Sequence, residues 1–224
     1  MFKKLITITI FFLFWFNLNA NSQQQELKTN IGFYGGLGLN LHSTFETYQK
    51  SELGIGPFVG IIGNFPINNM FVISGRIGYY NLNGSLFTDE INSTRYRVNA
   101  KLDYIEISPI LQIHNVLDNP LYFLAGLEFG APMSIKYDSV TTTPLGENVQ
   151  PDIDVVDKAS RLAIAAGVGY TFQLSDNIFL SPEASFRLPL TTVSTNSDYD
   201  KWNVSQIRLG VNLTYSLTKY EEPI

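Results

Sequence analysis

The chain has 224 residues, of which 45% are hydrophobic and 16% charged, and its formal net charge is −5. The absence of cysteine excludes a disulfide scaffold, a thiolate metal site and a lipid-modified N-terminal cysteine. A disordered chain is excluded because charges are few and aromatic residues make up 13% of the sequence. An acidic chain offers no basic surface for nucleic acid, so we expect no nucleic-acid partner.

The N-terminus predicts export. Lys3 and Lys4 precede an unbroken apolar run over residues 5–16, and the small residues Ala20 and Ser22 have the spacing of a signal-peptidase site. We therefore predict a signal peptide over 1–22 and a mature domain over 23–224, whose formal charge is −7 once both lysines are removed. The alternative is an uncleaved anchor, but the apolar run is shorter than the ~20 residues that a spanning helix needs.

The mature chain alternates apolar and polar residues with a period of two. Ile31 and Phe33 begin one apolar face, while Gly32 and Tyr34 begin the opposite one. Eight such runs are predicted as strands, at roughly 30–42, 52–64, 70–82, 99–113, 120–136, 159–174, 178–190 and 203–218. Most are about twice the usual strand length and long enough for the ~9–11 residues that a tilted transmembrane strand requires. The sequence therefore predicts an all-β fold, an eight-stranded antiparallel up-and-down transmembrane β-barrel.

The connections between the predicted strands alternate in length. Short turns follow the second, fourth and sixth strands, whereas longer polar loops are predicted at roughly 43–51, 83–98, 137–158 and 191–202. Short turns on one side and long loops on the other are typical of outer-membrane barrels with both termini in the periplasm. We expect the protein in the cell outer membrane, in contact with outer-membrane lipid.

Charged residues of the strands share the face opposite the apolar one. They form a predicted lumen charge network of Arg76, Glu106, Glu128, Arg161, Glu183, Arg187 and Arg208. A soluble lipocalin-type barrel, with its apolar face inside around a ligand, is the alternative. Most strand glycines share the charged face, however, as a narrow interior filled by side chains requires, and seven enclosed charges cannot form a dry apolar pocket. Enclosed charges must pair, so we expect Glu106 to reach Arg76 and Glu183 to contact Arg208. The network is predicted to be a structural plug; the alternative is a gated polar path for water or small ions.

The long alternating strands, and in particular the run Leu-Asp-Tyr-Ile-Glu-Ile-Ser-Pro at 102–109, resemble the outer-membrane β-barrel domain common in Bacteroidota. That family includes PorT-like proteins and has the same eight-stranded, OmpA-type architecture. The resemblance implies fold and location across nearly the whole mature chain. PorT is linked to a secretion and gliding apparatus, a role that the resemblance does not transfer.

The last strand carries a predicted assembly signal. Arg208, Gly210, Leu213 and Tyr215 follow the polar, glycine, apolar and aromatic pattern by which barrels are passed to the outer-membrane insertion machinery. We therefore expect that machinery as a partner during assembly. The chain departs from the usual pattern by continuing past the aromatic residue to Ile224.

Candidates for chemistry are few. His42 and Ser43 lie at the outer end of the first strand, where outer-membrane acyltransferases and deacylases use such residues, and Glu46 could supply an acid. A lone His-Ser pair is more often a solvated strand end, so we predict no catalytic residue. His114 is expected on the surface of a periplasmic turn. Three aspartates, Asp152, Asp154 and Asp157, are expected in a solvated acidic loop rather than a calcium site, and no cofactor or metal is predicted.

Three functions fit this sequence. The favoured one is a structural or interaction barrel, accessory to an envelope secretion complex, with an envelope protein as its partner. The others are a small low-conductance pore and a lipid-modifying enzyme. The sequence favours a protein that is not an enzyme.

The signal peptide and the barrel make a prediction about location. The mature protein should begin at Gln23 and should fractionate with the outer membrane. It should also run at different apparent sizes in boiled and unboiled gel samples, because a closed barrel resists unfolding by detergent. N-terminal sequencing, membrane fractionation and gel mobility measure these three properties, and recovery from the soluble periplasm would contradict the prediction.

Overall fold

The structure is a computed structural model that describes residues 27–43, 49–88, 93–116, 119–154, 159–193 and 202–217. The predicted signal peptide over 1–22 and its cleavage site before Gln23 lie outside these residues. Among the described residues, no helix has the length and apolarity needed to cross a bilayer.

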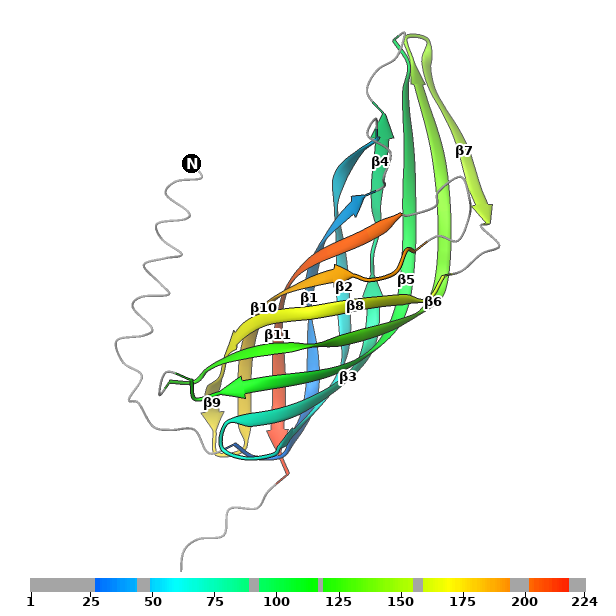
Figure 1. Cartoon of the computed structure of the whole chain (residues 1–224). Coiled ribbons are helices and arrows are strands. Elements are labelled where there is room, and N and C mark those ends of the chain that lie inside the picture. Colours follow the sequence, from blue (N-terminus) through cyan, green and yellow to red (C-terminus); the bar gives the residue numbers. More distant parts are fainter. Residues whose placement is uncertain are drawn as a thin grey trace, which may run out of the picture.

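The described chain is built from antiparallel strands. They are β1 (Asn30–Ser43), β2 (Gln49–Pro66), β3 (Phe71–Asn81), β4 (Gly84–Thr88), β5 (Arg95–His114), β6 (Leu121–Thr143), β7 (Gly146–Asp154), β8 (Arg161–Tyr170), β9 (Phe172–Ser175), β10 (Ile178–Pro189) and β11 (Asn203–Ser216). All belong to one 11-stranded sheet. Figure 1 shows this sheet rolled into a tilted barrel, with β4 to β7 rising beyond one end.

The sheet closes on itself because the first and last strands pair. β1 bonds to β2 on one side and to β11 on the other. The pairing of β1 with β11 is continuous from Asn30↔Ser216 to Ser43↔Asn203. β3 and β4 share one position in the ring, since both lie between β2 and β5, and β8 and β9 share another beside β10. With β7 outside the ring, the described strands occupy eight positions, and the predicted eight-stranded antiparallel barrel is confirmed.

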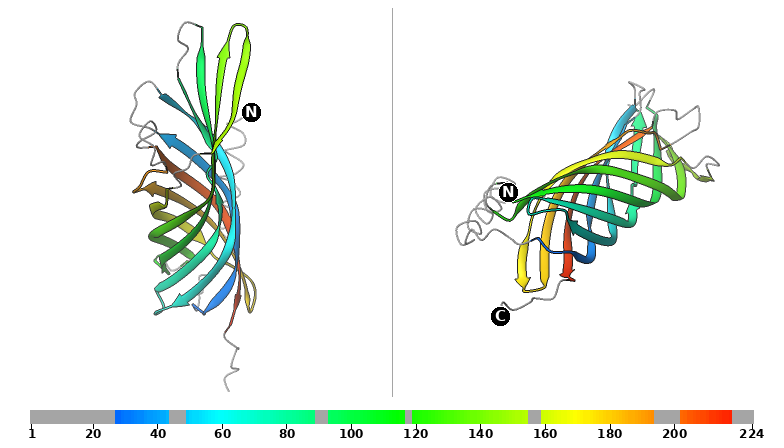
Figure 2. Two further views of the ribbon diagram at one scale, coloured as in Figure 1. Left: turned by 90° about the vertical axis from the view of Figure 1, so that its right-hand side faces the viewer. Right: turned by 60° about the horizontal axis from the view of Figure 1, so that its bottom comes forward.

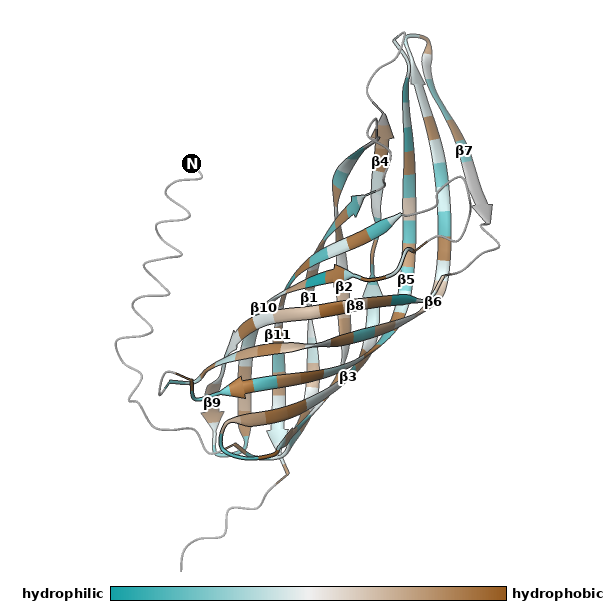
Figure 3. Ribbon diagram, in the orientation of Figure 1, coloured by the Kyte–Doolittle hydropathy of each residue, from teal (hydrophilic) through white to brown (hydrophobic). Residues whose placement is uncertain are grey.

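Alternation along each strand separates an apolar exterior from a polar interior. In β11, Arg208 is 2% exposed and its neighbour Leu209 is 56% exposed. In β1, Phe33 is exposed and Tyr34 is buried. Figure 3 shows the resulting brown and pale or teal bands alternating along the barrel strands. An apolar exterior is stable against lipid and not against water, so the lipocalin-type alternative is wrong for this chain.

The two ends of the barrel differ. At one end Leu217 donates its N–H to the carbonyl of Thr29, so both ends of the described chain meet there. The turns at this end are short, and the Asn68 side chain accepts from the N–H groups of Met70 and Phe71 to tighten one of them. At the other end the strands extend as long hairpins, which Figure 2 shows standing clear of the barrel wall.

Two of the predicted loops are in fact strand. The expected loop at 83–98 contains β4 and the first residues of β5, and the expected loop at 137–158 contains the end of β6 and all of β7. The hairpin between β6 and β7 turns at Gly146, whose φ of 130° suits glycine. The prediction failed here because these strand ends lie beyond the apolar band, so no lipid-facing residues mark their alternation.

The orientation of β11 makes a testable prediction. Leu209→Arg places a cation on the lipid face and should lower the free energy of unfolding by roughly 2–4 kcal/mol if the residue lies near the bilayer midplane. Leu209→Ala keeps the face apolar and should have a much smaller effect. Denaturant titration of protein folded into vesicles measures both, and equal effects would mean that Leu209 does not face lipid.

Candidate functional site: the charged barrel interior

Inward alternation brings seven charged side chains into the barrel interior. They come from six strands and comprise Arg76 on β3, Glu106 on β5, Glu128 on β6, Arg161 on β8, Glu183 and Arg187 on β10, and Arg208 on β11. Their side chains are 0–6% exposed. These are the residues predicted to form the lumen network, and they divide into two groups.

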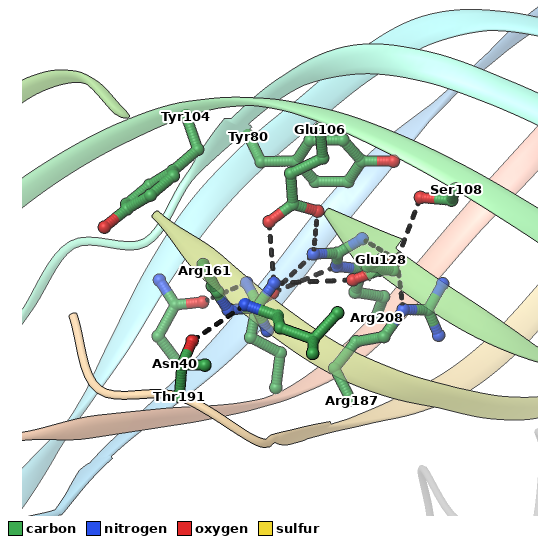
Figure 4. A network of polar contacts seen from close by, with 12 residues as sticks. Asn40, Tyr80, Tyr104, Glu106, Ser108, Glu128, Arg161, Arg187, Thr191 and Arg208 are labelled. Carbon is green, nitrogen blue, oxygen red and sulfur yellow. Dashed lines mark hydrogen bonds and ion pairs between the residues drawn. The ribbon is translucent and has the colours of Figure 1, made fainter. Parts of the chain in front are cut away.

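The larger group joins two carboxylates to three guanidinium groups (Figure 4). Arg208 bridges both acids, with Nη2 2.8 Å from Glu106 and Nη1 2.8 Å from Glu128. Arg187 donates its Nε–H to the same Glu128 oxygen at 2.5 Å. Arg161 donates from Nη1 to Glu106 at 2.7 Å and to Glu128 at 3.4 Å. We call these five residues the central cluster, and Glu128 is its hub because it accepts from all three arginines.

The smaller group is the pair of Arg76 and Glu183. Both terminal nitrogens of Arg76 bond to the two Glu183 oxygens, at 2.8 and 2.7 Å, in the bidentate geometry that makes such pairs strong. The Tyr122 hydroxyl, at 3.1 Å, and the Asn212 amide, at 3.3 Å, also donate to Glu183. Glu183 Oε1 thus accepts one hydrogen bond and Oε2 accepts three, all from groups inside the barrel.

The predicted pairings of Glu106 with Arg76 and of Glu183 with Arg208 are wrong. On neighbouring strands Arg76 lies opposite Ser108, and Arg208 lies opposite Ser185, so each predicted partner is one diagonal step away. The lumen is narrow enough that a long arginine side chain reaches the opposite wall instead. Arg76 crosses from β3 to β10, and Arg208 crosses from β11 to β5 and β6.

Apolar layers close the lumen on the outer side of the central cluster. Moving from Glu106 along β5, the next inward side chains are Tyr104, Leu102 and Ala100. They belong to a buried cluster completed by Leu82, Leu86, Ile135, Tyr137, Val193, Trp202 and Val204. Trp202 and Leu102 are each 0% exposed. This layer separates the charges from the hairpin end of the barrel.

Aromatic side chains close the other side. Tyr34, Phe58 and Tyr80 form one buried cluster, and the Arg208 guanidinium lies 4.0 Å from the centre of the Tyr80 ring. These rings occupy space left by inward glycines. A Cβ added at Gly60 or Gly78 would meet the Tyr34 hydroxyl. The sequence analysis missed this aromatic layer, although inward glycines beside inward aromatics were visible in the alternation.

Two hollows inside the barrel are small. One, of about 10 Å³, lies among the aromatic layer, Arg76, Glu183 and Arg208. The other, of about 40 Å³, lies at the end where the chain termini meet and is lined by His114, Gln112 and Tyr122 among others. The smaller hollow is about the size needed by a single water molecule. The interior is thus filled mainly by side chains.

His42 and Ser43 are not brought together. Ser43 is exposed, whereas His42 is 1% exposed and lies inside the outer apolar layer. Its Nε2 is 2.9 Å from the Leu82 carbonyl, which can only accept, so Nε2 carries the proton. Its Nδ1 therefore accepts from the Trp202 indole N–H at 2.9 Å. Both ring nitrogens are engaged, and neither is available as a general base in this arrangement.

The remaining candidates for chemistry were His114 and the three aspartates of the third predicted loop. His114 was expected on a turn surface, but this is wrong: it is the last residue of β5, is 7% exposed and stacks on Tyr122 with ring centres 4.8 Å apart. Asp152 and Asp154 are in β7, but their side chains and Asp157 lie outside what the structure describes. Within the described residues, no group of acidic and histidine side chains has an arrangement that would hold a metal ion.

The residues of the predicted assembly signal lie on both faces of β11. Arg208 points inward and belongs to the central cluster, and a Cβ at Gly210 would meet the Phe58 ring. Leu213 and Tyr215 are 47% and 53% exposed on the lipid face. The role of these residues in assembly stays a prediction.

Comparison with known proteins gives the family. The model of the outer membrane protein beta-barrel domain matches residues 20–193. The chain belongs to this family. It is therefore an outer-membrane protein. Barrels of this kind carry short turns on the periplasmic side, so we expect that side at the end where Thr29 meets Leu217 and the long hairpins outside. A comparison with curated proteins finds no match.

Solved barrels are similar at low identity. Ail of Yersinia pestis is 10% identical with a TM-score of 0.43, covering 84% of this chain and 99% of Ail. Neisserial surface protein A is 13% identical with a TM-score of 0.40, covering 84% of this chain and 97% of that protein. OprG of Pseudomonas aeruginosa is 7% identical with a TM-score of 0.41, covering 88% of this chain and 99% of OprG.

The pairing of Arg76 with Glu183 predicts an energetic coupling. Either Arg76→Ala or Glu183→Ala leaves a buried charge unpaired and should reduce the free energy of unfolding by roughly 3–5 kcal/mol. The double variant should recover much of the loss, with a coupling of at least ~1 kcal/mol. A cycle between Arg76 and Glu106 should give about 0.5 kcal/mol or less. Stronger coupling in the second cycle would show that the cross-lumen pairing is wrong.

Proposed function

We propose that this protein is a sealed outer-membrane barrel with a structural or interaction role, whose contacts are made by its extracellular hairpins. The observation that carries the proposal is the filled lumen, in which the central cluster lies between apolar and aromatic layers. A barrel without an open lumen acts through its outer surfaces. An accessory role in an envelope secretion complex is the specific form of this proposal.

The extracellular hairpins form a braced sheet. β5 and β6 stay paired from His114↔Tyr122 at the periplasmic end to Arg95↔Thr142 beyond the barrel. On the exterior of this sheet, an ion pair between Lys101 and Asp138, at 2.8 Å, links the neighbouring strands β5 and β6. A second, between Arg97 on β5 and Glu52 on β2, at 2.9 Å, reaches across β4. The barrel wall thus continues into a sheet that can hold a fixed shape outside the membrane.

The sheet ends at β7. Among the described strands β7 pairs only with β6, along Thr143↔Gly146 to Lys136↔Asp154. Backbone N–H and C=O groups on the far side of such a strand can pair with an extended segment of another protein. We propose this edge as the contact for an envelope protein.

The two other functions have less support. A pore would require displacement of the central cluster and of the apolar layer that contains Trp202. A lipid-modifying enzyme would require a base, and His42, the histidine considered for that role, has both ring nitrogens in hydrogen bonds. The proposal is therefore a protein that is neither a channel nor an enzyme.

The sealed lumen predicts an absence of conductance. Refolded wild-type protein in planar bilayers should give no current steps above the bare membrane, because the central cluster and the apolar layer fill the lumen. Leu209→Ala, on the lipid face, is the matched control and should behave identically. Regular current steps from the wild type, raised further in Glu106→Ala, would support the pore instead.

The proposed contact is tested by shortening the hairpin. Residues 140–149 are replaced by Asn-Gly between the paired residues Ser139 and Gln150, a loop that suits a tight hairpin. A partner recovered in stoichiometric amounts with the wild type from mildly solubilised envelopes should be lost with this variant.

The control for this experiment keeps the full length of β7. It replaces only Pro144 and Leu145 by Asn-Gly and should retain the partner. Both variants should keep the heat-dependent gel shift of a folded barrel. Equal recovery of the partner by both variants, or no stoichiometric partner of the wild type, would contradict the proposed contact.

A further inference from the structure

Arg161 in the central cluster uses only one of its donor edges. Its Nη1 donates to Glu106 and Glu128, whereas its Nε and Nη2 atoms are buried without a hydrogen-bond partner among the described residues. The side chain is 0% exposed, so bulk water does not solvate these two atoms. Unpartnered buried donors on a charged group are costly, since the group has lost its hydration and gained nothing in return.

The two unpartnered atoms form a recognised anion-binding geometry. The N–H groups of Nε and Nη2 point in parallel from one side of the planar guanidinium. Arginine uses paired donors of this kind to hold carboxylates and other anions in bidentate fashion. The neighbouring arginines have no such free edge, because Arg187 and Arg208 each donate their Nε–H to an acceptor, Glu128 and Gln206 respectively.

The charge balance of the interior independently calls for an anion. The described lumen residues include four arginines, Arg76, Arg161, Arg187 and Arg208, against three glutamates, Glu106, Glu128 and Glu183. The pair of Arg76 and Glu183 is neutral, so the excess positive charge lies in the central cluster. A water molecule would satisfy the two donors but would leave that excess charge in a low-dielectric interior.

We propose that the Nε and Nη2 edge of Arg161 binds one small monovalent anion, of the halide class, inside the barrel. Burial of the whole side chain limits the ligand to a small ion and excludes a phosphate ester or a lipid head group. The bound anion makes the central cluster neutral and thereby stabilises the seal. This site goes beyond the proposed interaction role and does not depend on it.

The proposal is tested by the effect of chloride on folding. The full mature chain, folded in vesicles of zwitterionic lipid, is unfolded in sodium chloride, in sodium bromide and in sodium gluconate at equal ionic strength. Both halides should stabilise the barrel in a saturable way relative to gluconate. At 100 times the dissociation constant, the folding equilibrium constant should rise by about 100-fold.

The variant Arg161→Gln should remove the halide effect, whereas Arg97→Gln, on the extracellular sheet, should keep it. Equal stability in chloride and gluconate, or a halide effect that persists in Arg161→Gln, would overturn the proposal. Because Arg161→Gln could fail to fold, crystals of the wild type grown in bromide give a second test. An anomalous peak beside Nε and Nη2 of Arg161 is expected, and a fully occupied water there, or bromide only elsewhere, would overturn the site.

Discussion

Enclosure of charge in a narrow barrel is the constraint on which the rest of this structure depends. Arg161, Arg187 and Arg208 are buried, so Glu106 and Glu128 must meet two of their three charges inside the barrel. A carboxylate that accepts from three arginines, as Glu128 does, links three walls of the barrel at one point. The small side chains and glycines of the lumen make room for these long side chains and for the aromatic rings beneath them.

The same constraint divides the molecule into two functional parts. Inside the membrane, the filled lumen leaves an apolar exterior against lipid and no large internal hollow among the described residues. Beyond the other end of the barrel, β5, β6 and β7 form a sheet, and among the described strands β7 pairs on one side only. Under the proposed function, the barrel anchors this sheet in the membrane and holds its surface at a fixed height above the bilayer.

Much of this architecture could be predicted from sequence because lipid enforces strict alternation. Leu209 and Arg208 are assigned to opposite faces by a period of two, and the structure agrees. Partners within the lumen could not be predicted in this way. Arg76 pairs with Glu183 and not with Glu106 because its side chain reaches across the barrel. The alternation within one strand contains no information about that reach. His114 was misplaced because strand β5 ends at His114, one residue beyond the predicted strand 99–113.

The most direct test of the sealed interior is the hydrogen exchange of arginine side chains. The chain has six arginines, and four of them, Arg76, Arg161, Arg187 and Arg208, are in the lumen. Nitrogen-15 NMR of the folded barrel at neutral pH should show slowly exchanging Nε–H signals from these four residues. Arg95 and Arg97, on the extracellular sheet, should exchange rapidly. Rapid exchange at all six positions would mean that water fills the lumen and would contradict the account.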